Sequence, residues 1–338
     1  MSGGVDSSVA AALLRERASC VVGLHMILHR EPAKGPLTAA LERARQAARH
    51  LGIPLHEIDL RADFRRAVVE PFERSYREGR TPNPCLTCNP AIKFGALLER
   101  ARELCGATCL ATGHYARLGG ANGDRALLRG ADPAKDQSYF LALVPRERLS
   151  ELRFPLGELT KAAVRQMAEG YRFWEELPEE SQEVCFLAGE DYRRLLGGQE
   201  RPGEIVDLAG HAVGEHRGVW NYTIGQRRGL GVCGPEPLYV RRLEPAANRV
   251  VVAPAGQAPF RSMSVGRLNW LCQPRERLRC TVRTRYRQAD QSCEATLGQD
   301  GCLRVTFDEP QRAVSPGQGA VFYAGERVLL GGIIEQAD

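Results

Sequence analysis

The first eight residues constrain the fold most, because a short loop rich in glycine and serine runs directly into a helix there. The loop consists of Met1, Ser2, Gly3, Gly4, Val5, Asp6, Ser7 and Ser8. Its glycines can adopt the tight or positive-φ backbone that a turn around a phosphate requires. Its last two serines place hydroxyl and N–H groups at a helix start, where the helix dipole also favours an anion. The pattern is equally typical of an ordinary capped helix, and without a nearby lysine it is not a Walker A motif.

Residues 1–150 alternate short apolar runs with helical patterns, which predicts an α/β, Rossmann-like domain with a parallel sheet and helices on both faces. Ligands of such sheets lie beyond the carboxyl ends of the strands, where Met26, Gly113 and His114 fall. A phosphate loop normally follows a buried strand, and the expected first strand is missing here. The expected strands lie at 20–26, 54–60 and 107–114, and the expected helices at 37–51, 61–77 and 91–104.

The residue composition changes at about residue 202, where glycines, prolines and short β-branched runs begin to dominate. These runs predict antiparallel strands that form small β-barrels. The expected strands lie at 219–224, 238–243, 249–252, 278–286, 303–307, 320–323 and 328–334. We therefore expect four domains: a catalytic domain at 1–150, a helical extension with a further cysteine at 151–205, a small β domain at 206–260 and a C-terminal barrel at 261–338.

The composition of the 338 residues limits the class of protein. No apolar run approaches the roughly 20 residues of a membrane span, and no secretory signal opens the sequence, so we expect a cytoplasmic protein. Structural disulfides are then improbable for the 11 cysteines, and a subset is expected to have redox, metal-binding or nucleophilic roles. Arginine so outnumbers lysine that each remaining lysine is a candidate for a specific role. The lysines are Lys34, Lys93, Lys135 and Lys161.

Two stretches contain candidate reactive cysteines. Cys85 and Cys88 form a C-x-x-C motif in a loop stiffened by prolines, and Cys185 follows the polar residues 181–183. A single C-x-x-C is typical of half a zinc site or of a redox pair. No second C-x-x-C or Cys/His pair has the spacing of a zinc finger, which disfavours structural zinc. Cys185 alone fits a buried cysteine as well as a nucleophile.

Taken together, these motifs resemble the bacterial tRNA-specific 2-thiouridylases (the MnmA/TrmU family) from one end of the chain to the other. The opening loop resembles the pyrophosphate loop of the N-type ATP pyrophosphatases. The similar stretches are 2–8, 81–89, 92–94, 111–117, 135–141, 154–157 with Lys161, 181–186, 222–231, 283–287 and 310–318. The resemblance implies ATP-dependent 2-thiolation of the wobble uridine (position 34) of tRNA. ATP, with Mg²⁺, would adenylate the C2 oxygen, and AMP and pyrophosphate would be released.

The resemblance also implies a role for each matching residue. Cys185 would carry a persulfide and Cys88 would act as the second catalytic, resolving cysteine, with sulfur supplied by a cysteine desulfurase or a sulfur-relay protein. The residues 2–8, Met26 and Gly113 would bind ATP. The β domains would contact tRNA. The residues expected to contact tRNA or its flipped base are Asn83, Pro84, Cys85, His114, Lys135, Asp136, Gln137, Arg285, Tyr286 and Gln318.

Three alternatives remain open at this stage. In many family members an aspartate occupies the position of Cys85, so Cys85, Cys88 and Cys185 could hold a 4Fe–4S cluster with one open iron. A ligase with the same ATP loop could adenylate a small molecule and would need neither cysteine stretch. A chain that truly lacks its first strand could be an inactive RNA-binding relic, because neighbouring strands would keep unpaired buried groups.

Overall fold

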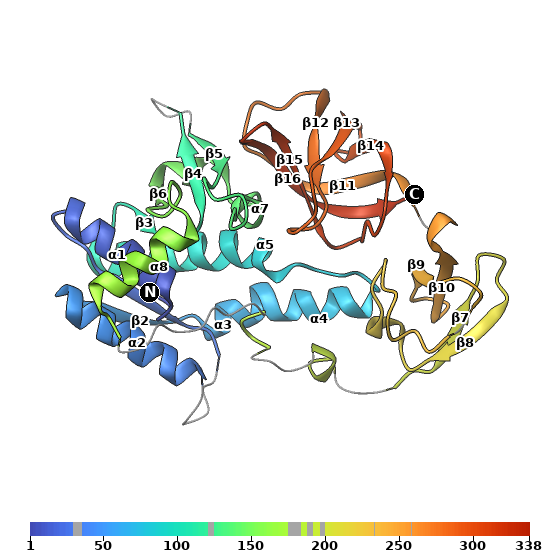
Figure 1. The fold of residues 1–338 in the computed structure, drawn as a ribbon, viewed down its shortest axis with the longest axis horizontal. Coiled ribbons are helices and arrows are strands. Elements are labelled where there is room, and N and C mark those ends of the chain that lie inside the picture. The colour runs from blue at the N-terminus through green and yellow to red at the C-terminus, as the bar shows by residue number, and fades with distance from the viewer. Residues whose placement is uncertain are drawn as a thin grey trace. The chain divides into compact units, whose positions relative to one another are not determined.

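The computed structural model describes residues 1–29, 36–120, 125–174, 184–187, 192–196, 200–232, 234–257 and 259–338 (Figure 1). The polar residues 181–183 before Cys185 lie outside this part. The chain divides into two compact units. The first contains Met1–Val68, Cys85–Gly189 and Gly325–Val328, and the second contains Val69–Pro84, Glu190–Ala324 and Leu329–Asp338. No helix in the described part is long and apolar enough to cross a membrane.

The first unit is an α/β domain with parallel strands, as predicted. Strand β1 pairs in parallel with β2, and β3 pairs in parallel with β6, so the described residues form two parallel pairs rather than one continuous sheet. Beside β1, the Met1 carbonyl lies 2.9 Å from the His25 ring. These strands and the first helices of the unit are α1 (Val5–Arg17), β1 (Gly23–Ile27), α2 (Pro36–Leu51), β2 (Leu55–Asp59), α3 (Arg61–Phe64), β3 (Leu110–Ala111) and β6 (Leu152–Arg153).

The core of this unit forms around α1. Its small and apolar side chains, among them Val9 and Ala12, are buried and allow close packing against α2 and α8 (Lys161–Tyr171). Tyr115, Val164 and Phe173 complete the same cluster. Figure 1 shows α1, α2, α8 and β2 grouped together. Between β3 and α8 lie β4 (Ala116–Gly119), β5 (Ala126–Arg129), α7 (Ser138–Leu141) and η3 (Arg146–Glu151).

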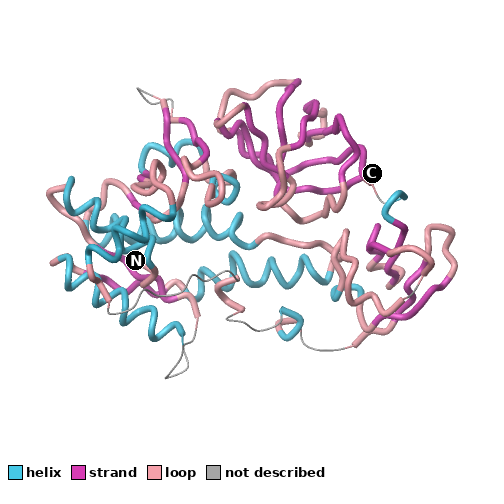
Figure 2. The backbone as a smooth tube through the Cα atoms, viewed as in Figure 1, coloured by secondary structure: helices cyan, strands magenta, loops and turns pink. Residues whose placement is uncertain are grey.

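A long helical stretch carries the C-x-x-C motif. It begins as α5 (Pro84–Cys88), continues as the π-helix η2 (Asn89–Ala96) and ends as α6 (Leu97–Cys105). Figure 2 draws these helical segments in cyan, like every helix. Gly106 terminates it at a φ of +63°, a conformation that favours glycine. The predicted helix at 91–104 is therefore confirmed, with an earlier start. The predicted helix at 61–77 is confirmed as α3, η1 (Arg65–Val69) and α4 (Glu70–Arg77), the last of these in the second unit.

The second unit is rich in antiparallel strands, as expected. Four strands form a sheet in the order β8-β7-β10-β9, in which β7 and β10 pair in parallel and the other neighbours are antiparallel. Six more strands follow in the order β11-β14-β13-β12-β15-β16. Strand β16 also pairs with β11, so the six strands close into a barrel whose apolar side chains are buried inside. The strands are β7 (Gly203–Val206), β8 (Ala212–His216), β9 (Leu238–Glu244), β10 (Arg249–Pro254), β11 (Phe260–Trp270), β12 (Arg277–Arg283), β13 (Gln291–Leu297), β14 (Leu303–Gln311), β15 (Gly319–Ala324) and β16 (Arg327–Ala337).

The prediction of a strand at residues 219–224 is wrong. Residues 219–224 begin with the 3-10 helix η5 (Val219–Asn221), although their apolar pattern predicted a strand. The turns around this stretch are glycines, since Gly218 has a φ of 152° and Gly225 has a φ of 84°. The apolar side chains of the stretch still enter the core of the second unit. A short apolar run between glycines does not distinguish a strand from another buried segment.

Candidate active site

The glycine-serine loop forms a tight turn at the start of α1. Gly3 has a φ of +75°, and a Cβ atom there would lie 1.9 Å from the carbonyl oxygen of Ala40. This combination of backbone angle and contact admits only glycine. The Arg43 Nε donates a hydrogen bond of 3.0 Å to the Gly3 carbonyl and so fixes the turn against α2.

The serine hydroxyls of the loop hold its backbone rather than cap the helix. Ser7 Oγ and Ser8 Oγ each donate to the Gly4 carbonyl at 3.1 Å, and the Ser2 amide donates to Ser7 Oγ at 3.1 Å. The N-terminus of α1 has no side-chain cap. Its first N–H groups can therefore bind an anion such as a phosphate, with the helix dipole adding to the attraction.

Asp6 connects this loop to two other elements of the first unit. Its Oδ1 accepts hydrogen bonds from Lys161 Nζ at 2.6 Å and from the Tyr115 hydroxyl at 2.7 Å. The Lys161 side chain is only 11% exposed. Lys161 begins α8, and Thr160 caps that helix by accepting from the Ala163 amide. The rarity of lysine in the sequence had marked Lys161 as a candidate for a specific role. In the structure it forms an ion pair with Asp6 of the glycine-serine loop.

Gly113 lies against the same loop. A Cβ atom at this position would come within 2.8 Å of the Asp6 carbonyl group, so the backbone after β3 touches the backbone of the loop. The sequence placed Gly113 at the carboxyl end of a strand, and the structure places it beyond the end of β3, which finishes at Ala111. Met26 lies near the end of β1, opposite Ile58 of β2. A role of Gly113 and Met26 in binding ATP stays a prediction.

The three candidate thiols influence one another. Burial raises the pKa of the Cys88 thiol to about 12, and the Cys185 and Cys85 thiols add to this rise. Burial, followed by the charge of Cys85, also raises the pKa of Cys185. Protein atoms around the sulfur raise the pKa of Cys85 as well, although Cys85 and Cys185 are exposed residues. In each case the positive charge of Lys93 lowers the pKa. The charge of one lysine thus affects thiols of both cysteine stretches.

Lys93 also contacts the buried histidine that follows Gly113. Its Nζ lies 3.4 Å from His114 Nε2, and His114 Nδ1 lies 2.7 Å from Thr112 Oγ1. Burial, followed by the charge of Lys93, lowers the pKa of His114 well below 6.5. His114 is therefore neutral at neutral pH. The scarcity of lysine had marked Lys93 as a candidate for a specific role, but the sequence predictions assigned it to no site.

The three thiols do not fit an iron–sulfur cluster. Across the described ranges, no group of three His, Cys, Asp or Glu side chains is arranged to hold a metal ion. A cluster held by Cys85, Cys88 and Cys185 would need all three sulfurs arranged around it as ligands. The alternative of a 4Fe–4S cluster is therefore not supported by the donor geometry.

Residues 135–137 belong to the loop before α7. The Asp136 side chain is buried, and its Oδ1 accepts from the Gly130 and Ser138 amides at 3.0 Å each. Gln137 Oε1 accepts from the Tyr115 amide at 3.0 Å. Asp136 and Gln137 thus fix the backbone around Tyr115, whose hydroxyl contacts Asp6. The Lys135 amide donates to the Asp132 carbonyl and closes a turn. Their predicted contact with the flipped base stays a prediction.

The predicted RNA-contacting residues of the second unit meet around two turns. The Arg285 guanidinium donates to the Ile224 carbonyl at 2.9 Å and to Ser315 Oγ at 2.8 Å. Gln318 Nε2 donates to the Thr81 carbonyl at 2.9 Å. The stretches 79–84, 222–231, 283–287 and 310–318 are therefore joined within this unit. Asn83 and Pro84 end the first of these stretches, and the half-buried Tyr286 lies in the turn after β12. Their contact with RNA stays a prediction.

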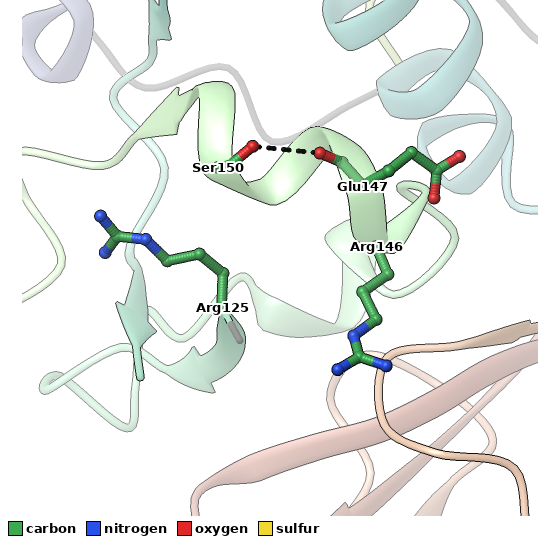
Figure 3. A pocket seen from close by; sticks show the side chains of 4 residues that line it. All are labelled: Arg125, Arg146, Glu147 and Ser150. Carbon is green, nitrogen blue, oxygen red and sulfur yellow. Dashed lines mark hydrogen bonds between the residues drawn. The ribbon is translucent and has the colours of Figure 1, made fainter. Parts of the chain in front are cut away.

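A small pocket of the first unit has no counterpart in the sequence predictions. Figure 3 shows it lined by Arg125, just before β5, and by Arg146, Glu147 and Ser150 of η3. Ser150 Oγ donates to the Glu147 carbonyl at 3.2 Å. The Arg125, Arg146 and Glu147 side chains extend in different directions in Figure 3, so they do not converge on one ligand.

Comparisons with known proteins place the chain first in a class and then in a family. Residues 1–189 match the model of the tRNA methyl transferase HUP domain, residues 196–254 the tRNA methyl transferase PRC-barrel domain, and residues 260–334 the aminomethyltransferase β-barrel domain. A HUP domain followed by two β domains is the class of protein that the fold and the loop define.

Curated relatives identify the family within this class. The chain is 44% identical over 348 residues to the tRNA-specific 2-thiouridylase MnmA of Magnetococcus marinus, covering 99% of this chain and 97% of the relative. It is 45% identical over 357 residues to that of Methylobacterium radiotolerans, covering 100% and 93%. It is 44% identical over 351 residues to that of Chloroflexus aurantiacus, covering 100% and 98%. The chain belongs to the tRNA-specific 2-thiouridylase family.

Proposed function

We propose that the protein catalyses ATP-dependent 2-thiolation of the wobble uridine of tRNA. One observation carries this proposal: two consecutive residues of the first unit connect a phosphate loop to a cluster of thiols. Gly113 touches the backbone of Asp6 in the loop, and His114 contacts Lys93, whose charge acts on all three cysteines. An activated carbon formed at the loop would thus lie near a sulfur nucleophile. The names of the relatives, all tRNA-specific 2-thiouridylases, support the same reaction.

The proposed reaction has two stages. The C2 oxygen of the uridine attacks the α-phosphate of ATP, and pyrophosphate leaves at the N-terminus of α1, where the first N–H groups of the helix can bind an anion. The terminal sulfur of a Cys185 persulfide then attacks C2. Cys88 loses its proton to solvent and attacks the Cys185 sulfur, which forms a Cys88–Cys185 disulfide, leaves the sulfur on C2 and expels AMP. An external thiol reductant restores both cysteines.

Several parts of this proposal concern groups that bind the chain. Mg²⁺ would accompany ATP and neutralise its phosphate charge, as is usual for nucleotide phosphates. A cysteine desulfurase or a sulfur-relay protein would supply the persulfide sulfur. The C-terminal barrel at 261–338 would contact tRNA through Arg285, Tyr286 and Gln318, by charge and by stacking on unpaired bases. The protein would act in the cytoplasm.

Thiolation of unmodified tRNA by the purified protein tests the proposal. With ATP, Mg²⁺ and a persulfide donor, we expect 2-thiouridine in tRNA and one AMP for each sulfur transferred. Cys88→Ser and Cys185→Ser should abolish thiolation. Cys105→Ser is the matched control, because Cys105 is an exposed cysteine that ends the helical stretch carrying Cys88.

Two outcomes would contradict the proposal. If AMP forms only with a small carboxylic acid and both serine variants stay active, the protein is a ligase. The matching domain models are described as tRNA methyl transferase domains. Mass spectrometry of the nucleosides therefore decides between an added methyl group and an exchange of oxygen for sulfur. We expect the exchange.

A further inference from the structure

Lys93 lies on the helical stretch that also carries two of the candidate thiols. In an α-helix, residues five apart such as Cys88 and Lys93 would be rotated by about 140° around the axis. Residues 89–96 instead form a π-helix, whose i→i+5 hydrogen bonds widen the turn and bring residues five apart closer to one side of the helix. The π-helix therefore turns the Lys93 side chain towards the side of the helix that carries Cys88. Such segments are frequent at functional sites.

The neutral imidazole of His114 holds the Lys93 ammonium. An ammonium group can only donate, so the Nε2 of His114 at 3.4 Å carries the lone pair and Nδ1 carries the proton. This proton then points to Thr112 Oγ1 at 2.7 Å. The rings of Phe94 and Phe154 lie with centroids 6.0 Å from that of His114 and enclose it. His114 thus positions the ammonium and adds no positive charge of its own.

A thiolate among these groups needs a counter-charge. Burial opposes the ionisation of Cys85, Cys88 and Cys185, and a charge on one thiol opposes ionisation of its neighbours. The positive charge of Lys93 acts on all three in the opposite direction. One cation can therefore stabilise the thiolate of any of the three sulfurs. Because a charge on one sulfur opposes ionisation of the others, we expect it to stabilise one thiolate at a time.

We propose that the Lys93 ammonium is the shared counter-charge of the sulfur transfer, stabilising first the Cys185 persulfide anion and then the Cys88 thiolate. This inference rests on the proposed function, in which these two sulfurs act in turn. When the persulfide attacks C2, its negative charge leaves Cys185. The ammonium is then free of that anion at the moment when Cys88 must lose its proton to attack.

The pH dependence of thiol alkylation tests this role without requiring the thiolation reaction. The rate of modification by iodoacetamide is measured for Cys85, Cys88 and Cys185 separately by peptide mass spectrometry, in wild type, Lys93→Met and Lys93→Arg. Since the thiolate is the reacting form, Lys93→Met should slow alkylation about tenfold for each unit by which the pKa rises. Lys93→Arg keeps the charge and should recover most of the rate. Arg100→Met, in α6 of the same helical stretch and paired with Glu103, is the matched control and should leave the profile unchanged.

Wild-type alkylation profiles in a folded Lys93→Met protein would overturn the inference. So would an arginine variant as slow as the methionine variant, because shape rather than charge would then matter. Lys93→Gln, which keeps a polar end, replaces Lys93→Met if the latter does not fold. If the profiles shift as expected but wild-type protein does not thiolate tRNA, the role of Lys93 stands and the proposed function fails.

Discussion

Replacing Lys161 by methionine should weaken both the stability of the first unit and its affinity for ATP. Lys161 Nζ lies 2.6 Å from Asp6 Oδ1, with 11% of the lysine side chain and 34% of the aspartate side chain exposed. Removing one partner of a fully buried ion pair costs about 3–5 kcal/mol, because the other charge stays buried without compensation. Asp6 is one-third exposed and keeps the Tyr115 hydroxyl at 2.7 Å, so we expect about 2–3 kcal/mol.

Thermal unfolding measures this cost. For a unit of this size, a loss of about 2–3 kcal/mol corresponds to a fall in Tm of about 4–12 °C. The uncompensated Asp6 carboxylate also lies in the loop at the N-terminus of α1, where it should repel the phosphates of ATP. Titration calorimetry should therefore show a higher Kd for ATP in Lys161→Met.

The double variant Asp6→Asn/Lys161→Met is the control for unpaired charge. It removes both charges, so its unfolding free energy should be higher than that of Lys161→Met alone. The reasoning is refuted if Lys161→Met unfolds within about 0.5 kcal/mol of wild type, the usual scatter of surface substitutions. It is also refuted if the two changes simply add, because adjacent charges that form a pair must be coupled.

Three further predictions concern other parts of the molecule. Gly113→Ala should cost about 1–3 kcal/mol and weaken ATP binding in calorimetry, because its Cβ would lie 2.8 Å from the Asp6 carbonyl group, whereas Gly170→Ala meets no atom within 4 Å and should be tolerated. The free energy of unfolding should fall as pH drops below about 6.5, because unfolded His114 binds a proton that the buried form rejects, and urea titrations of His114→Gln should show a shallower fall. Arg285→Met should lower the urea midpoint of the second unit by the equivalent of about 1–2 kcal/mol, since its carbonyl and hydroxyl partners lose a charged donor.

The sequence predicted elements well where a pattern was long and regular. The helix at 37–51 has apolar residues at helical spacing, and the structure contains it as Pro36–Leu51. Most of the predicted strands of the second unit also match, because turn residues separate them clearly. The pattern failed at Val219–Asn221, where glycines on either side bend a short apolar run that would otherwise suit a strand.

The site was less accessible to such reasoning, since it depends on contacts between distant residues. Asp6 and Lys161 are 155 positions apart, and periodicity carries no information about their ion pair. Cys88 and Cys185 came together in the sequence argument only through resemblance to a family. The rarity of lysine marked Lys93 as a candidate, but its place beside the thiols could not be predicted, because the sequence pattern of 89–96 looks like that of an ordinary helix and not of a π-helix.

The junction at residues 113 and 114 explains why this loop and these thiols can work together. Ligand sites of parallel sheets are formed by residues just beyond the carboxyl ends of the strands, and Gly113 and His114 follow the end of β3 in this way. Gly113, with no side chain, lets the backbone touch the loop at Asp6, while the His114 ring reaches Lys93. One strand end thus contacts the phosphate loop on one side and the counter-charge of the thiols on the other. A shift of this backbone by the size of one methyl group would alter both contacts, so the glycine is as much a requirement of the sulfur chemistry as of the ATP loop.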